Sequence, residues 1–283
     1  MTSDFIPLHD FSKDDTSSIA FCYIPLEEKI DHNTAVPHRH NYYEIFVFIK
    51  GGGYHWIDFE KHEIQSNSLH FVSPGQVHQV QRLEGSYGHV IFFSRDFYLN
   101  KTSLFDFPFL NNYGENPILN LSTSEMESFF PVLELIQKEG NSNFQNQADI
   151  IRSYLNVILL QSARFYQQNA PSMLSNSNEH NLYKTFRNLL EQSFRTLHKV
   201  KDYADEMNVT EKNLNLSIRQ HTGKTASEHI FDRIILEAKR LLIHSPKSAK
   251  EIAFFLGFDD PSHFSKFFKK NTDSSPNEFR SLN

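Results

Sequence analysis

The sequence predicts an α+β protein of two domains, with a small β-barrel plus helices at the N-terminus and an all-α domain at the C-terminus. Three observations predict this. In the first hundred residues, short runs rich in aromatic and β-branched residues end at Gly or Pro, which is typical of strands. In the last hundred, apolar residues recur at helical spacing. A chain of 283 residues is long enough for two domains, each with its own hydrophobic core.

Residues 1–100 contain four strand-like runs. Residues 40–50 are rich in aromatic and β-branched side chains and stop at three glycines. Residues 54–59 have an alternating pattern, residues 68–72 end shortly before a Pro-Gly pair, and residues 89–93 form the last run. Many short strands punctuated by Gly and Pro indicate a small barrel or a jelly roll.

Residues 101–170 predict two helices. Ser122 and Glu125 have the spacing of a capping box. The helix that follows carries apolar residues on one side, namely Met126, Phe129, Phe130, Leu133 and Ile136. A second helix is expected around residues 149–168. Residues 171–179 are polar and turn-forming, which indicates a linker between the domains.

Residues 250–270 have the pattern of a helix-turn-helix. Ile252 and Leu256 lie one turn apart on a first helix, and Gly257 can adopt the left-handed conformation that ends it. Pro261 suits the first turn of a second helix, because its missing amide hydrogen is not needed there. The second helix has an apolar face of Phe264, Phe267 and Phe268 and an exposed face of Ser262, Lys266 and Lys269. A helical hairpin that does not bind DNA would show the same apolar spacing.

Residues 199–219 repeat this plan, with the turn at residues 208–209 and Thr210 as N-cap of the second helix. The helix between the two units, residues 225–244, has about 20 residues and a length of about 30 Å. This length is close to the roughly 34 Å between successive major-groove faces of a duplex. Two recognition helices held this far apart could therefore lie on one side of DNA.

Residues 180–282 resemble the AraC/XylS family of bacterial transcription regulators. The resemblance is carried by a long ordered set of motifs, which are residues 238–242 (AKRLL), 251–253 (EIA), 256–258 (LGF), 262–270 (SHFSKFFKK) and 275–280 (SPNEFR). It implies a double helix-turn-helix domain that binds double-stranded DNA. The exposed positions of the two second helices are the expected DNA contacts: Thr210, Glu211, Asn213, Asn215, Arg219, Pro261, Ser262, His263, Ser265, Lys266, Lys269 and Lys270.

Four positions depart from the family pattern. The family usually has Gly at Asp273, often Arg at Lys266, and often a basic and an aromatic residue at Leu216 and Ile218. A glycine is suited to a turn, so we expect another turn conformation at Asp273. Leu216 cannot hydrogen-bond a guanine but can touch a thymine methyl group. The first unit is therefore expected to read sequence differently, or mainly to position the protein.

The N-terminal region resembles the cupins, the ligand domain that AraC-type regulators commonly carry. His38, His40, Glu44 and a Pro-Gly pair shortly before His78 have the order of the two cupin motifs. The resemblance implies an effector pocket, for which we expect His38, His40, Tyr42, Glu44, Trp56 and His78. Aromatic residues of this kind can stack on a sugar or an apolar effector, but they can equally form core.

Two interpretations of the histidines stay open. The even spacing of His38, His40 and Glu44 lets them face the same way on one strand, and with His78 they could chelate a divalent metal as in catalytic cupins. The chain would then be a metal-dependent enzyme with a helical appendage. Alternatively, hydrogen-bonded imidazoles line a pocket. Regulatory cupins mostly lack a metal and the second motif is compressed, so we expect no cofactor and no catalytic residues.

Charge also divides the chain. Residues 180–283 hold 17 basic and 13 acidic residues, a net charge of +4, whereas the remainder holds 11 and 21, a net charge of −10. One domain facing nucleic acid and one that does not would show this asymmetry. The single cysteine excludes an internal disulfide, and neither a secretory signal nor a membrane-spanning stretch is evident. We therefore expect a cytoplasmic protein.

Together these patterns predict a sequence-specific transcription regulator controlled by a small-molecule effector. In the resembled family the helices between the two domains often form the dimer contact, so we expect a homodimer through residues 101–170. An activator would also contact RNA polymerase.

Overall fold

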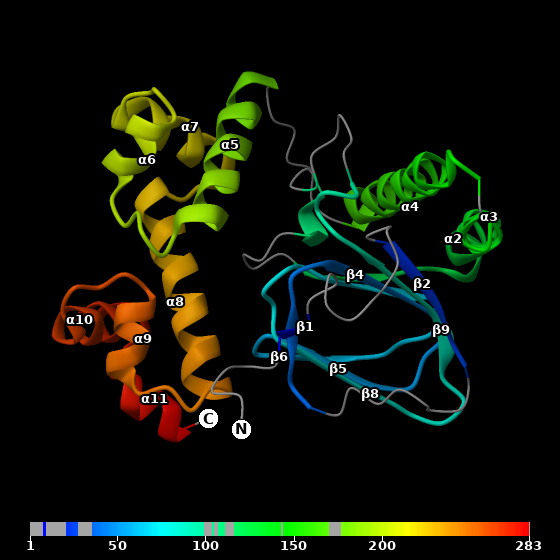
Figure 1. The fold of residues 1–283 in the computed structure, drawn as a ribbon, viewed down its shortest axis with the longest axis horizontal. Helices are drawn as coiled ribbons and strands as arrows, with labels where there is room; N and C mark the ends of the chain where they lie inside the picture. Colours follow the sequence, from blue (N-terminus) through cyan, green and yellow to red (C-terminus); the bar gives the residue numbers. More distant parts are fainter. Residues whose placement is uncertain are drawn as a thin grey trace. The chain divides into compact units, whose positions relative to one another are not determined.

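The computed structural model describes residues 8–9, 21–27, 36–98, 104, 107–110, 116–142, 144–169 and 177–282 (Figure 1). The described residues form two compact units, one up to residue 169 and one from residue 177. Most of the predicted linker, residues 171–176, lies outside the described residues, and residues 177–179 already belong to a helix. Among the described helices, none combines the length and apolarity needed to cross a membrane.

The N-terminal unit contains two principal sheets. One has the strand order β10-β7-β4-β9-β2, the other β6-β5-β8, and β1 pairs with β3 in parallel. The strand bounds are β1 Leu8–His9, β2 Phe21–Leu26, β3 Arg39–His40, β4 Tyr43–Lys50, β5 Gly53–Ile57, β6 Glu60–Glu63, β7 Ser68–Val72, β8 His78–Arg82, β9 Tyr87–Phe93 and β10 Ile118–Asn120.

The predicted strand over residues 40–50 is interrupted. β3 ends at His40, the chain bends at residues 41–42, and β4 begins at Tyr43. The bend brings the Tyr42 carbonyl oxygen to 2.7 Å from His40 Nδ1, so a side-chain hydrogen bond replaces regular strand pairing there.

The five-stranded sheet is buried on both faces, which explains why β4 is almost continuously apolar. Tyr43, Ile45 and Val47 point to a core shared with the helices of this unit. Phe46 and Phe48 point the other way, into a second core between the two sheets. The interior between the sheets is therefore the barrel interior.

Three helices cover the outer face of the five-stranded sheet: α2 Thr123–Glu127, α3 Phe130–Gly140 and α4 Gln147–Asn169 (Figure 1). The Ser122–Glu125 capping box is confirmed. The single helix predicted after it is wrong, because α2 stops at Glu127 and α3 begins at Phe130. Pro131 has no amide hydrogen to continue α2, and it occupies the first turn of α3 instead.

The C-terminal unit is all-helical, as predicted. Its helices are α5 Ser177–Ser193, α6 Val200–Glu206, α7 Glu211–Thr222, α8 Ala226–His244, α9 Ala249–Phe255, α10 Pro261–Thr272 and α11 Pro276–Leu282. Figure 1 shows the α6–α7 pair at one end of α8 and the α9–α10 pair at the other. Both pairs are helix-turn-helix units.

The two units repeat the same backbone plan with different residues. The turn between α6 and α7 has Asn208 at φ 55°, and that between α9 and α10 has Gly257 at φ 81°. The second helix of each unit is capped by a left-handed residue, Gly223 after α7 and Asp273 after α10. Asp273 therefore keeps the conformation that glycine favours, and the expectation of another turn conformation was wrong.

Gly257 is the most constrained of these positions. A Cβ atom added to it would lie 1.9 Å from the Arg195 carbonyl oxygen, in addition to the strain of its positive φ. We predict that Gly257→Ala lowers the free energy of unfolding by at least about 2 kcal/mol. Denaturant unfolding followed by circular dichroism measures this change.

Gly140→Ala is the matched control, because a Cβ atom there meets nothing within 4 Å. It should leave stability unchanged or raise it by up to about 1 kcal/mol. Equal effects of the two substitutions would contradict the close approach at Gly257.

Candidate functional site

Helix α10 presents a polar, basic face. Asp260 caps its N-terminus by accepting a hydrogen bond from the Ser262 amide at 2.8 Å, and Pro261 occupies the first turn. Phe264 and Phe268 are buried and hold the helix against the rest of the unit. The predicted contact residues that are exposed on α10 are Ser262, His263, Lys266, Lys269 and Lys270.

Two of the residues on α10 that were predicted to contact DNA are less exposed than the others. Pro261 and Ser265 are half-buried, and the Ser265 hydroxyl donates to the Pro261 carbonyl at 2.9 Å. The surface of α10 that can enter a groove is therefore its lysine-bearing side.

Helix α7 presents a different face. Thr210 caps it by accepting from the Asn213 amide at 3.2 Å, as predicted, and Leu214 and Ile218 are buried. Its exposed side chains among the described ones are Glu211, Lys212, Asn213, Leu216, Arg219 and Gln220. Leu216 is 55% exposed, so an apolar side chain stands in the middle of this surface.

Asn215 differs from its predicted role. It is half-buried, and its Oδ1 accepts a hydrogen bond from the Ala226 amide at 3.1 Å. This bond joins α7 to the first turn of α8, so the Asn215 side chain positions α7 on α8.

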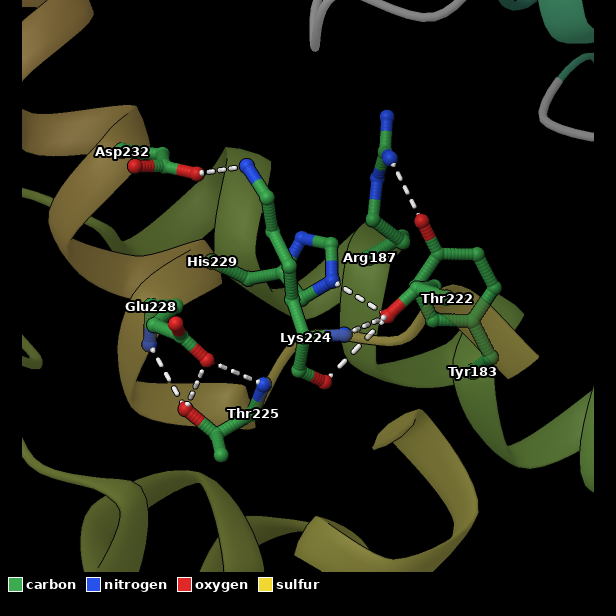
Figure 2. A network of polar contacts seen from close by, with 8 residues as sticks. All are labelled: Tyr183, Arg187, Thr222, Lys224, Thr225, Glu228, His229 and Asp232. Carbon is green, nitrogen blue, oxygen red and sulfur yellow. Dashed lines mark hydrogen bonds and ion pairs between the residues drawn. The ribbon is translucent and has the colours of Figure 1, made fainter. Parts of the chain in front are cut away.

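A partly buried polar network also fixes α7 (Figure 2). The Thr222 hydroxyl lies 2.9 Å from His229 Nε2 on α8 and accepts from the Lys224 amide at 3.2 Å. On α5, Arg187 donates to the Tyr183 hydroxyl at 2.8 Å, and the Tyr183 ring lies 5.7 Å from the His229 ring. The network joins α5, the end of α7 and the start of α8.

The barrel interior holds a second group of polar residues. His40 Nε2 lies 3.1 Å and His78 Nε2 lies 3.3 Å from the same Glu44 oxygen, Oε2. The three side chains come from β3, β4 and β8, and all are buried. One ligand atom from each residue lies within 4.8 Å of the others, so this group could hold a metal ion.

The group continues as a chain of imidazoles. His78 Nδ1 lies 3.2 Å from His55 Nε2, and His55 Nδ1 lies 3.1 Å from His70 Nδ1. His70 Nε2 lies 3.2 Å from the Ser68 hydroxyl. Burial lowers the pKa of His70 to about 3 and that of His55 well below its usual value, so both rings are neutral at physiological pH.

Asp58 holds the loop that immediately precedes His78 in the sequence. Its two carboxylate oxygens accept from the Val77 amide and from the Gln76 side chain, both at 3.2 Å. Gln76 in turn accepts from the Ser73 amide at 2.8 Å. These bonds hold the compressed motif in a shape that still brings His78 to Glu44.

The predicted pocket residues separate into two sets. Tyr42 stacks on His40 at 4.1 Å, and the His38 ring lies 4.2 Å from the His78 ring. Trp56 does not join them. It lies on the opposite face of β5 from His55, where Lys61 Nζ is 5.2 Å from the Trp56 ring.

His55 and His70 were missed by the sequence analysis. The alternation of residues 54–59 placed His55 and Ile57 on one face of a strand, but it did not show which face is internal. Which face of β5 is internal depends on the pairing of β5 with β8, in which Ile57 lies opposite His78.

Comparisons with known proteins match both units. Residues 203–281 match a helix-turn-helix domain, and residues 22–102 match the AraC-like ligand binding domain. The HTH-type transcriptional activator RhaR of Mannheimia succiniciproducens is 25% identical over 252 residues, which are 86% of each chain. The HTH-type transcriptional activator RhaS of Escherichia coli O157:H7 is 23% identical over 275 residues, covering 96% of this chain and 95% of that one.

Among solved structures, ToxT from Vibrio cholerae O395 is similar at 16% identity with a TM-score of 0.42, covering 93% of this chain and 98% of that one.

A ligand-binding barrel followed by two helix-turn-helix units defines a DNA-binding transcription regulator rather than an enzyme. The chain belongs to the AraC-type regulators.

The neutral state of His229 provides a test of the network around α7. Burial and the nearby Arg187 lower its pKa to about 4. Between pH 6.5 and pH 4 the unfolded chain therefore binds more protons, and stability falls as pH falls. We predict that wild type loses about 2 kcal/mol more of its unfolding free energy than His229→Gln between pH 7.5 and pH 5.

Denaturant unfolding at each pH measures this difference. His263→Gln, at an exposed position on α10, should keep the wild-type pH dependence. Identical pH profiles for wild type and His229→Gln would show that His229 is not held neutral.

Proposed function

We propose that this regulator activates transcription by placing α7 and α10 in successive major-groove faces of double-stranded DNA, under the control of a ligand in the barrel. The observation that carries the proposal is the repeat of two helix-turn-helix units on α8. With 19 residues, α8 is about 28 Å long. The distance between successive major-groove faces, about 34 Å, is similar.

The two helices would contribute differently. The lysines at one side of α10 suit phosphates and guanine, so this helix would supply both affinity and base discrimination. Leu216 on α7 suits a thymine methyl group, while Arg219 can contact guanine or phosphate. The ligand would act by shifting the population between arrangements of the DNA-binding units.

Three further features complete the proposal. The relatives that are named activators support contact with RNA polymerase. The helices between the barrel and the DNA-binding domain, within residues 101–170, would form a homodimer and so bring two DNA-binding domains together. A regulator that binds the chromosome of a bacterium works in the cytoplasm.

Lys266→Ala tests the role of α10. It should weaken binding to the specific site by about 1–3 kcal/mol, relax the preference at one base position and reduce the salt dependence of binding. Titration of labelled DNA at several salt concentrations measures all three. Lys138→Ala, an exposed lysine on α3, is the control and should bind as wild type does. Unchanged binding by Lys266→Ala would place α10 outside the groove.

The dimer proposal has its own test. Val157 and Leu160 lie near one another on α4 and are 39% and 47% exposed, which suits burial by a second copy. The Val157→Asp/Leu160→Asp double variant should sediment as a monomer at concentrations where wild type is a dimer. Phe144→Asp, which changes an exposed apolar residue before α4, should stay dimeric. A dimeric double variant would refute an interface at this face.

A further inference from the structure

The loop between α5 and α6, residues 194–199, is fixed both to the first helix-turn-helix unit and to α8. The Tyr203 hydroxyl on α6 donates a hydrogen bond to the Leu197 carbonyl at 2.9 Å. The Phe194 side chain is buried, and the Arg233 guanidinium of α8 lies 3.7 Å from the centre of its ring. The loop therefore has a defined position relative to both elements.

The same loop contacts the turn of the second unit. Gly257, between α9 and α10, lies so close to the Arg195 carbonyl oxygen that a Cβ atom would not fit between them. The Arg195 guanidinium lies 5.0 Å from the centre of the Phe255 ring, and the centres of the His198 and Phe258 rings are 4.9 Å apart. One backbone contact and two side-chain contacts thus join the two units directly, in addition to the contacts that each unit makes with α8.

Phe258 connects this loop to α10. Its ring centre lies 5.4 Å from those of Phe264 and Phe267, both on α10. Phe264 is buried, so a displaced Phe258 would disturb the packing of α10. Phe267 also contacts Phe231 of α8, at 5.2 Å between ring centres. Helix α10 is therefore held at two places, by α8 through Phe231 and by the α5–α6 loop through Phe258.

The His198 ring is neutral in this contact. Burial lowers the pKa of its imidazole below the usual value, although hydrogen bonding with the backbones of Leu256 and Phe194 acts in the opposite direction. Its Nε2 atom is buried and has no hydrogen-bond partner among the described residues. Because a neutral ring adds no charge near DNA, a substitution at His198 tests the contact without changing the attraction to phosphates.

A second contact matters because one helix alone does not fix the angle between two units. Packing on α8 sets the distance between the units along its axis, but a unit held only by this helix can still rock about that axis. On a duplex, one base pair corresponds to about 3.4 Å along the axis and to a rotation of about 34–36°. Two recognition helices therefore need a fixed angle as well as a fixed distance.

We propose that His198 is a positioning residue for DNA recognition, which fixes the angle of α10 relative to α7 and so sets the spacing of the two sequence elements that the chain accepts. His198 acts through Phe258 and not through a contact of its own with a base. The role in DNA recognition rests on the proposed function, whereas the restraint on the second unit does not.

The DNA test compares full-length wild type with His198→Ala. The labelled sites carry the two elements at the selected spacing, or with one base pair inserted or removed between them. Wild type should lose at least about tenfold in affinity when the spacing changes. His198→Ala should bind the selected spacing more weakly than wild type and should lose less than about threefold when the spacing changes.

Thr196→Ala is the matched control. Thr196 lies in the same loop and is exposed, and its hydroxyl donates to the Ser193 carbonyl at 3.1 Å, within the first unit. This variant should keep the spacing preference of wild type. A variant that is merely less folded loses affinity for all spacings by the same factor, so the ratio of affinities separates positioning from stability.

Hydrogen exchange tests the restraint without DNA. The Phe258 amide donates to the Ala253 carbonyl at 3.0 Å. This amide should exchange at least about tenfold faster in His198→Ala than in wild type or Thr196→Ala. Unchanged exchange would show that His198 does not restrain the second unit.

Two results on DNA would overturn the positioning role. One is a spacing preference in His198→Ala equal to that of wild type, and the other is wild type that accepts the changed spacings without loss. If wild type binds no specific site, the proposed function fails, while the exchange result still decides whether His198 restrains the second unit.

Discussion

The DNA-binding unit depends on the rigidity of α8, because both helix-turn-helix units pack on this one helix. The apolar face of α8 is buried, and three charged side chains of the same helix, Arg233, Glu237 and Arg240, are buried as well. Glu237 Oε2 lies 3.2 Å from Arg233 and 3.4 Å from Arg240, and Arg233 also pairs with Glu191 of α5 at 3.0 Å. Removing one partner of such a buried pair is costly, so the network favours one arrangement of α5 against α8. A fixed distance between the second helices of the two units, α7 and α10, requires such a single arrangement of the helices around α8.

In the barrel, the apolar residues that stabilise the fold and the polar residues of the interior lie on opposite faces of one sheet. The five-stranded sheet rests on a large apolar core with α2–α4 on its outer side. Its inner side can therefore carry two buried polar residues, Glu44 and His70, which face the histidines of the other strands. Because these groups are buried and hydrogen-bonded to one another, a bound ligand would change the balance of interactions between the two sheets directly.

Local signals predicted several helix caps and turns well. The caps at Ser122 and Thr210 and the turn at Gly257 depend on neighbours within a few residues, and all were predicted from the sequence. The barrel interior depends instead on pairing between distant strands. His55 and Trp56 are adjacent in the sequence, and only the register of β5 with β8 decides which of them faces inward. The role of Asn215 was hidden for the same reason, since its partner lies on another helix.

The most direct test of the account is a selection of genomic fragments from the source organism that bind the full-length chain at physiological salt. The account predicts recovered sites with two short sequence elements about one helical turn, or about 10 base pairs, apart. The same selection in the presence of metabolite extract covers the liganded state. Binding that is weak, independent of sequence and sensitive to salt under all of these conditions would contradict the claim that two helices of this chain read the major groove.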